Sequence, residues 1–230
     1  MATSRIEATA WPEVKSAPLW IRAGFWLCIL IAAAAVLRRI AVFELPNASS
    51  SRTAALDAVF ASHEALTLVH IIPALAFVII VPVVLFGWLP DARWPEPLLF
   101  RLGLVVSLTA YAMSAYPIGG WLEVSAVLVF NTLFLFSLIR AYLYKRRGDT
   151  PLKRRWLVRA IGILLGIATT RPIMGIFFAT SPLTHLRPHQ FFGIAFWLGF
   201  SINTLIVEIW LRTRPLGSKT PARAALSASQ

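Results

Sequence analysis

The chain has 230 residues, of which 58% are hydrophobic and 14% charged, and its formal net charge is +12. A soluble globular domain carries roughly 25% charged residues, so this composition excludes an ordinary soluble domain and a disordered chain. The single cysteine, Cys28, excludes a disulfide scaffold. The basic residues lie between and beside long apolar runs, which favours membrane lipids as partners and gives no support to nucleic acid.

Six apolar runs are long enough to cross a bilayer, which takes about 20 helical residues. Each run must satisfy its backbone hydrogen bonds internally, so each is predicted to be a helix. The expected spans are Leu19–Val42, Leu66–Leu89, Leu98–Ile118, Trp121–Tyr144, Trp156–Ala179 and Gln190–Leu211. The sequence thus predicts an all-α integral membrane protein with a bundle of six transmembrane helices over residues 19–211. We expect a cytoplasmic N-terminal segment (1–18) and a disordered basic cytoplasmic tail (212–230).

The distribution of positive charge predicts the orientation of the bundle. With the N-terminus in the cytoplasm, most of the 22 Lys and Arg residues face the cytoplasm, including the basic loop Lys145–Arg155. Translocating such a loop is unfavourable, so the positive-inside rule selects this orientation. We therefore expect a multi-pass protein of a bacterial inner (cytoplasmic) membrane with both termini on the cytoplasmic side.

A set of polar residues along the second half of the chain follows a recognisable pattern. It runs from a basic-Trp-x-x-Arg segment at 155–159, through Thr170-Arg171, to Trp197, Asn203 and Glu208, and His70 opens an earlier helix. Over roughly residues 60–212 the chain resembles a large bacterial family of multi-pass membrane proteins, the domain-of-unknown-function 2306 type. The resemblance implies a membrane fold but no established activity. Such proteins often carry a second histidine before the third span, where this chain has Leu99-Phe100-Arg101.

Arg171 lies inside the fifth predicted span, about 5 Å outward of its midpoint. An arginine at that depth costs at least about 2.5–3.5 kcal/mol unless it is paired. One interpretation is structural, with Asn131, Thr170 and backbone carbonyls satisfying the guanidinium. The other is a ligand site in the outer half of the bundle, formed by His70, Asn131, Thr170 and Arg171.

Two further patterns predict contacts between helices. Arg159 and Glu208 both lie at the cytoplasmic ends of neighbouring antiparallel spans, so we expect them to form a structural ion pair. Gly162 and Gly166 have the small-xxx-small spacing that lets helices approach closely. That face can pack within the bundle or form a homo-oligomer. Separately, the sequence leaves open a protein partner in a membrane complex.

All four histidines fall on the predicted outer side, namely His63, His70, His185 and His189. Imidazole is a good ligand for haem iron and transition metals, which makes these residues metal candidates. The sequence has no G-x-S-x-G, H-E-x-x-H or P-loop motif, so nothing in it favours an enzyme.

Two functions therefore remain. The first is a non-catalytic module that binds a lipid, a quinone or a small anionic ligand in the outer half of the bundle. The alternative is a haem- or metal-containing redox protein that uses the outer-face histidines. The sequence identifies no cofactor, and we expect none. If the protein does bind a cofactor, haem and quinone are the candidates.

Overall fold

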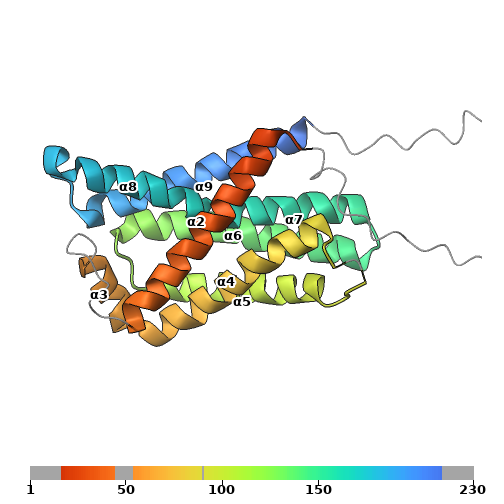
Figure 1. The fold of residues 1–230 in the computed structure, drawn as a ribbon, viewed down its shortest axis with the longest axis horizontal. Coiled ribbons are helices and arrows are strands. Elements are labelled where there is room, and N and C mark those ends of the chain that lie inside the picture. The colour runs from red at the N-terminus through yellow and green to blue at the C-terminus, as the bar shows by residue number, and fades with distance from the viewer. Residues whose placement is uncertain (1–16, 45–53, 90, 214–230) are drawn as a thin grey trace, which may run out of the picture.

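The computed structural model describes residues 17–44, 54–89 and 91–213 (Figure 1). Most of the predicted N-terminal segment and tail therefore lies outside the described residues. The described part is helical and contains no strand. Its helices are α2 (Leu19–Glu44), α3 (Ala54–Ser62), α4 (Glu64–Phe86), α5 (Pro95–Met113), α6 (Gly120–Arg146), α7 (Thr150–Leu164), α8 (Gly166–Thr184) and α9 (Pro188–Arg212).

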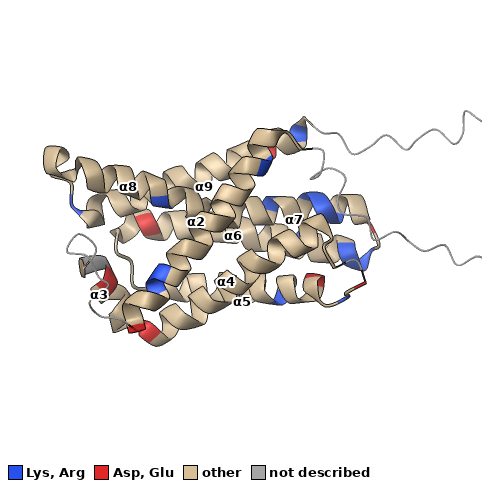
Figure 2. Cartoon of the chain, viewed as in Figure 1, with Lys and Arg blue, Asp and Glu red and all other residues tan. Residues whose placement is uncertain are grey.

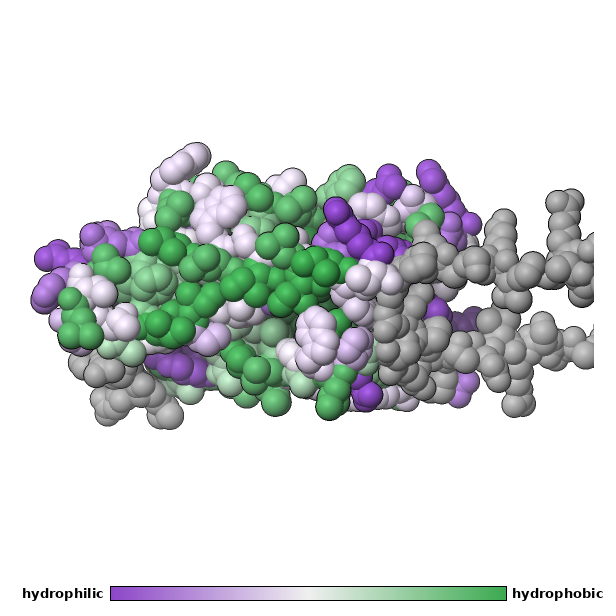
Figure 3. Space-filling view, turned by 90° about the horizontal axis from the view of Figure 1, so that it is seen from above, coloured by the Kyte–Doolittle hydropathy of each residue, from purple (hydrophilic) through white to green (hydrophobic). Residues whose placement is uncertain are grey.

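Six helical segments are long and apolar enough to cross a membrane, as the sequence predicted. They are α2, α4, α5, α6, the rod formed by α7 and α8, and α9. The space-filling view shows the corresponding surface, an apolar band between more polar ends (Figure 3). The protein is an all-α, multi-pass membrane protein.

Two local features differ from the predicted spans. The predicted span Trp156–Ala179 is two helices that meet at Leu165, where the Ala168 N–H donates to the Leu165 carbonyl at 2.9 Å in a tight i→i−3 turn. The short helix α3 was not predicted, because nine residues are too few to give a spanning signal. It lies next to α4 at one end of the bundle (Figure 1).

The helices pack mainly as antiparallel neighbours along the chain, α4 with α5, α6 with α7 and α8 with α9. Helix α2 crosses the bundle obliquely and contacts α4 and α8 (Figure 1). We call the end with α3 and the α8–α9 connection the α3 end, and the end with the α6–α7 connection the α7 end. Basic residues gather at the α7 end (Figure 2), where Glu96 accepts from Lys145 and Lys153 at 3.3 and 3.1 Å.

Small residues allow α9 to approach the α7–α8 rod closely. A Cβ atom on Gly162 would lie 2.4 Å from Val207 Cγ2, and one on Gly166 would lie 2.5 Å from the Phe200 ring. The Gly162–Gly166 face therefore packs against α9 within this chain, which was one of the two uses the spacing allowed.

Candidate functional site

The Arg171 side chain, on α8, has no charged partner in the part of the chain that the structure describes. Its Nε atom is buried without a hydrogen-bond partner, and no described residue forms a hydrogen bond or ion pair with the guanidinium. The structural interpretation required Asn131, Thr170 or carbonyls to satisfy this group, and the described residues do not do so.

Arg171 lines a partly open cavity of about 430 Å³. This volume falls in the range of roughly 300–1,000 Å³ that is typical of small-molecule pockets. Side chains from every described helix line the cavity, and they include three of the four residues that the sequence analysis grouped into a ligand site: His70, Asn131 and Arg171. The structure thus brings these three residues together around one space.

Thr170, the fourth residue of that group, does not line the cavity. It is fully buried, its hydroxyl donates to the Ile167 carbonyl at 2.7 Å, and its backbone packs against Gly199 of α9. A Cβ atom on Gly199 would lie 2.7 Å from the Thr170 nitrogen. Thr170 is therefore a packing residue between α8 and α9.

His70, on α4, has one ring nitrogen engaged and one available. Its Nδ1 lies 2.8 Å from Thr109 Oγ1, and the Thr109 hydroxyl lies 2.7 Å from the Val105 carbonyl, to which it donates. Since that hydroxyl has a single proton, the His70 Nδ1–H is the donor to Thr109. Nε2 then carries the free lone pair and can accept a hydrogen bond from a ligand in the cavity.

Asn131, on α6, is held by α5. Its side-chain amide donates to the Ser107 carbonyl at 3.0 Å, which leaves its own carbonyl oxygen available as an acceptor. His70 and Asn131 therefore present hydrogen-bond acceptors around the cavity, while Arg171 presents unpaired donors.

The sequence analysis missed four further charged residues that line the cavity: Arg38, Arg39, Asp57 and Glu123. Asp57 of α3 is buried and accepts from both arginines of α2, with Arg38 Nη2 at 3.1 Å. Arg39 also lies over the Phe60 ring, 4.1 Å from its centroid. The sequence did contain a signal for this ion-pair cluster. Two adjacent arginines, Arg38 and Arg39, directly follow an apolar run and precede a connection that contains a single aspartate, Asp57.

The Glu123 carboxylate accepts hydrogen bonds from the backbone at the start of α6. Its Oε2 accepts from the N–H groups of Ile118 and Gly119, both at 2.7 Å. Three arginines and two carboxylates thus line the cavity, and the two carboxylates contact groups other than Arg171. The described lining has an excess of one positive charge, because the Arg38–Arg39–Asp57 cluster and Arg171 each carry one positive charge and Glu123 carries one negative charge.

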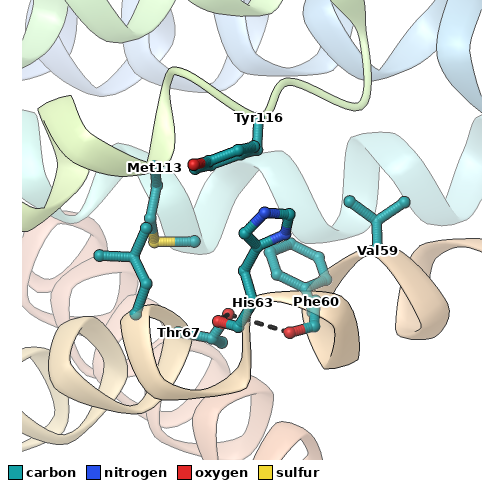
Figure 4. A pocket seen from close by; sticks show the side chains of 7 residues that line it. Val59, Phe60, His63, Thr67, Met113 and Tyr116 are labelled. Carbon is teal, nitrogen blue, oxygen red and sulfur yellow. Dashed lines mark hydrogen bonds between the residues drawn. The ribbon is translucent and has the colours of Figure 1, made fainter.

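The four histidines occupy separate surroundings. The His63 ring lies against the Tyr116 ring at a tilt of 32°, with centroids 3.7 Å apart (Figure 4). The pair borders a small pocket of about 20 Å³ that has room for about one water molecule. His70 is bonded to Thr109, whereas His185 ends α8 and His189 lies at the start of α9. Among the described residues, no group of three or more His, Cys, Asp or Glu side chains could hold a metal ion.

The redox alternative stays a prediction. A visible absorption spectrum of the purified protein tests it, since a bound haem gives a Soret band and a protein without haem does not.

Arg159 and Glu208, the expected ion pair, are in direct contact between α7 and α9. Arg159 Nε donates to Glu208 Oε2 at 2.8 Å, and Arg159 Nη2 donates to Glu208 Oε1 at 3.3 Å. The guanidinium also lies over the Trp156 ring, 4.7 Å from its centroid, and Arg212 joins Glu208 at 3.2 Å. The bidentate geometry and the position at the α7 end give this cluster a structural role.

Comparison of the chain with models of protein families, with curated proteins and with solved structures finds no match. The resemblance to the domain-of-unknown-function 2306 type stays a prediction.

Proposed function

We propose that this protein is a non-catalytic membrane module that binds a lipid, a quinone or a small anionic ligand in the cavity beside Arg171. The observation that carries the proposal is the Arg171 guanidinium, which lines the cavity with no hydrogen-bond or ion-pair partner among the described residues. A ligand oxygen that accepts from the guanidinium offsets the cost of an unpaired charge at membrane depth, at least about 2.5–3.5 kcal/mol. Membrane lipids are the expected partners.

We further propose that the protein lies in a bacterial inner membrane with both termini in the cytoplasm. The support comes from charge, because the basic residues of the α6–α7 connection gather at the α7 end (Figure 2). The positive-inside rule then assigns the α7 end to the cytoplasm. In this orientation the polar part of the cavity, with Arg38, Arg39 and Asp57, faces the outer side.

Thermal unfolding of the purified protein in phosphatidylcholine nanodiscs tests the binding proposal. The probes are dodecanoate, a short-chain naphthoquinone and inorganic phosphate, each added in excess. A ligand at one hundred times its Kd stabilises the folded state by about 2.7 kcal/mol, so at least one probe should raise the unfolding temperature.

The variants to compare are Arg171→Gln and a matched control, Arg101→Gln, which removes an exposed arginine of α5 that does not line the cavity. We expect the stabilising probe to act on the wild type and on Arg101→Gln but not on Arg171→Gln. No response to any probe, or an equal response in all three proteins, contradicts the proposal.

A further inference from the structure

The polarity of the cavity changes along its length. Its polar lining residues lie in the part toward the α3 end, and they include Arg38, Arg39, Asp57, Glu123, His70, Asn131 and Arg171. On the α7 side of this polar part, the described lining is wholly apolar and includes Val78, Phe134, Ile163 and Phe200. A ligand that matches this lining is polar at one end only.

The apolar part is deep enough to accommodate a chain. Ile163 lies eight residues before Arg171, and Val78 lies eight residues after His70. At 1.5 Å per helical residue, each spacing corresponds to about 12 Å of depth below the polar level. Two helices from different parts of the chain thus give the same depth.

The volume of the cavity limits the size of the ligand. At roughly 30 Å³ for each water-sized group, 430 Å³ holds on the order of 14 non-hydrogen atoms. One alkyl chain of about ten carbons with a compact head fits this volume. A phospholipid with two long chains does not fit, so it would have to leave most of its chains outside.

Small side chains create the space. The lining includes Ala32 and Ala35 of α2, Ala74 of α4, Ala110 of α5 and Gly175 of α8. A Cβ atom on Gly175 would meet nothing within 4 Å. Protein interiors are normally close-packed, so a void of this size bordered by small residues from four helices is a feature that a ligand would fill.

We propose that the ligand is a single-chain anionic amphiphile, with a carboxylate or phosphate monoester on Arg171 and its alkyl chain in the apolar part of the cavity. This inference rests on the proposed function and names the ligand class of the same site. The anionic head supplies the acceptor oxygens that Arg171 lacks among the described residues, and the chain fills the space between Phe134, Ile163 and Phe200.

Photolabelling in phosphatidylcholine nanodiscs tests the inference. The probe is dodecanoate with a diazirine at the end of its chain, and the labelled residues are identified by mass spectrometry. We expect labels around Phe134, Ile163 and Phe200, suppressed by excess dodecanoate or dodecyl phosphate. The suppressor that acts at the lower concentration distinguishes a carboxylate from a phosphate head.

Two variants separate the head from the chain. Arg171→Gln removes a charge-assisted contact, which should reduce cavity labelling at least tenfold, whereas Arg101→Gln should leave it unchanged. Ala74 lines the cavity four residues after His70, about 6 Å toward the α7 end. Ala74→Phe therefore fills the apolar part and keeps Arg171, so it should also abolish cavity labelling. Because Ala74→Phe retains the arginine, it keeps the test valid if Arg171→Gln does not fold.

Other outcomes overturn the inference in distinguishable ways. In one such outcome, no residue of the cavity is labelled, but acetate, inorganic phosphate or a short-chain naphthoquinone stabilises the wild type and not Arg171→Gln. This result would keep the binding site and reject the amphiphile as its ligand. In another outcome, the labels are confined to exposed, lipid-facing residues such as Ile79 and Leu205 and are equal in Arg171→Gln, and no probe stabilises any of the proteins. This result would reject both the binding site and the amphiphile.

Discussion

Arg171 occupies a place where a charge is stable only when something neutralises it. In the ligand-free protein its guanidinium has no partner among the described residues, so replacing it by glutamine removes an unfavourable burial. We expect ligand-free Arg171→Gln to be at least as stable as the wild type, with a free energy of unfolding higher by up to about 2 kcal/mol. Thermal or chemical unfolding of delipidated protein in a zwitterionic detergent measures this. A loss of more than about 1 kcal/mol would assign Arg171 a structural role instead.

The Arg159–Glu208 pair gives the opposite prediction, because both partners are present. The two side chains are partly exposed, at 23% and 31%, so the coupling is discounted for solvent screening. A double-mutant cycle with Arg159→Gln and Glu208→Gln should give a coupling energy of about 1 kcal/mol in favour of the pair. Additive effects of the two substitutions would show that the contact does not stabilise the fold.

At the level of single residues, the sequence could identify polar groups inside spans but not the direction of each side chain. Arg171 and His70 stand out because polar side chains inside apolar runs need a reason. Thr170 was grouped with Arg171 because the two lie at the same depth, yet successive residues of a helix point about 100° apart. That rotation turns Thr170 toward Gly199 of α9 and Arg171 toward the cavity.

Among the helices, α8 and α9 approach each other closely at Gly199. A Cβ atom there would lie 2.7 Å from the backbone nitrogen of Thr170, and backbone cannot move aside cheaply. We therefore expect Gly199→Ala to destabilise the protein by about 1–3 kcal/mol in thermal or chemical unfolding.

Gly175→Ala is the matched control, because a Cβ atom on Gly175 meets nothing within 4 Å. Replacing a helical glycine by alanine in open space stabilises the helix by roughly 0.5–1 kcal/mol. The two Gly→Ala changes should therefore have opposite signs. If Gly199→Ala were as stable as Gly175→Ala, the close packing of α8 on α9 would be wrong.

Helix α3 explains why three of the five charged lining residues, Arg38, Arg39 and Asp57, were not predicted. Depth was counted only along the spans, so Asp57, in a connection, was not considered as a partner for groups inside the bundle. Arg38 and Arg39 were counted only as charges that set the orientation. In the structure α3 lies against α4 and brings Asp57 to both arginines, a contact between segments that hydropathy does not describe.

For the whole molecule, the number of helices that can cross a membrane followed from hydropathy alone, because a bilayer imposes both length and apolarity on each span. The cavity could not be predicted in this way. Its existence depends on the side-chain volumes that several helices present to one another, and a single apolar residue reads the same in a sequence whether it fills a core or borders a void.

The orientation of the bundle is open to a direct test with cysteine labelling. In a Cys28→Ser background, cysteines replace Ala61 of α3 or Thr150 of α7, both of which are exposed and lie at opposite ends. A membrane-impermeant maleimide added to intact cells should label the Ala61 position and spare the Thr150 position. Labelling of Thr150→Cys alone would invert the orientation, and equal labelling of both would reject the topology.

The central claim is that the cavity beside Arg171 holds a ligand through that side chain, and native mass spectrometry of protein extracted from its membrane tests it most directly. The account predicts a single bound species on the wild type and on Arg101→Gln that is lost from Arg171→Gln. Arg171→Lys should retain part of it, since a lysine keeps the charge but not the forked donor geometry. Wild-type protein without any bound species, or an equal amount of the same species on Arg171→Gln, would contradict the account.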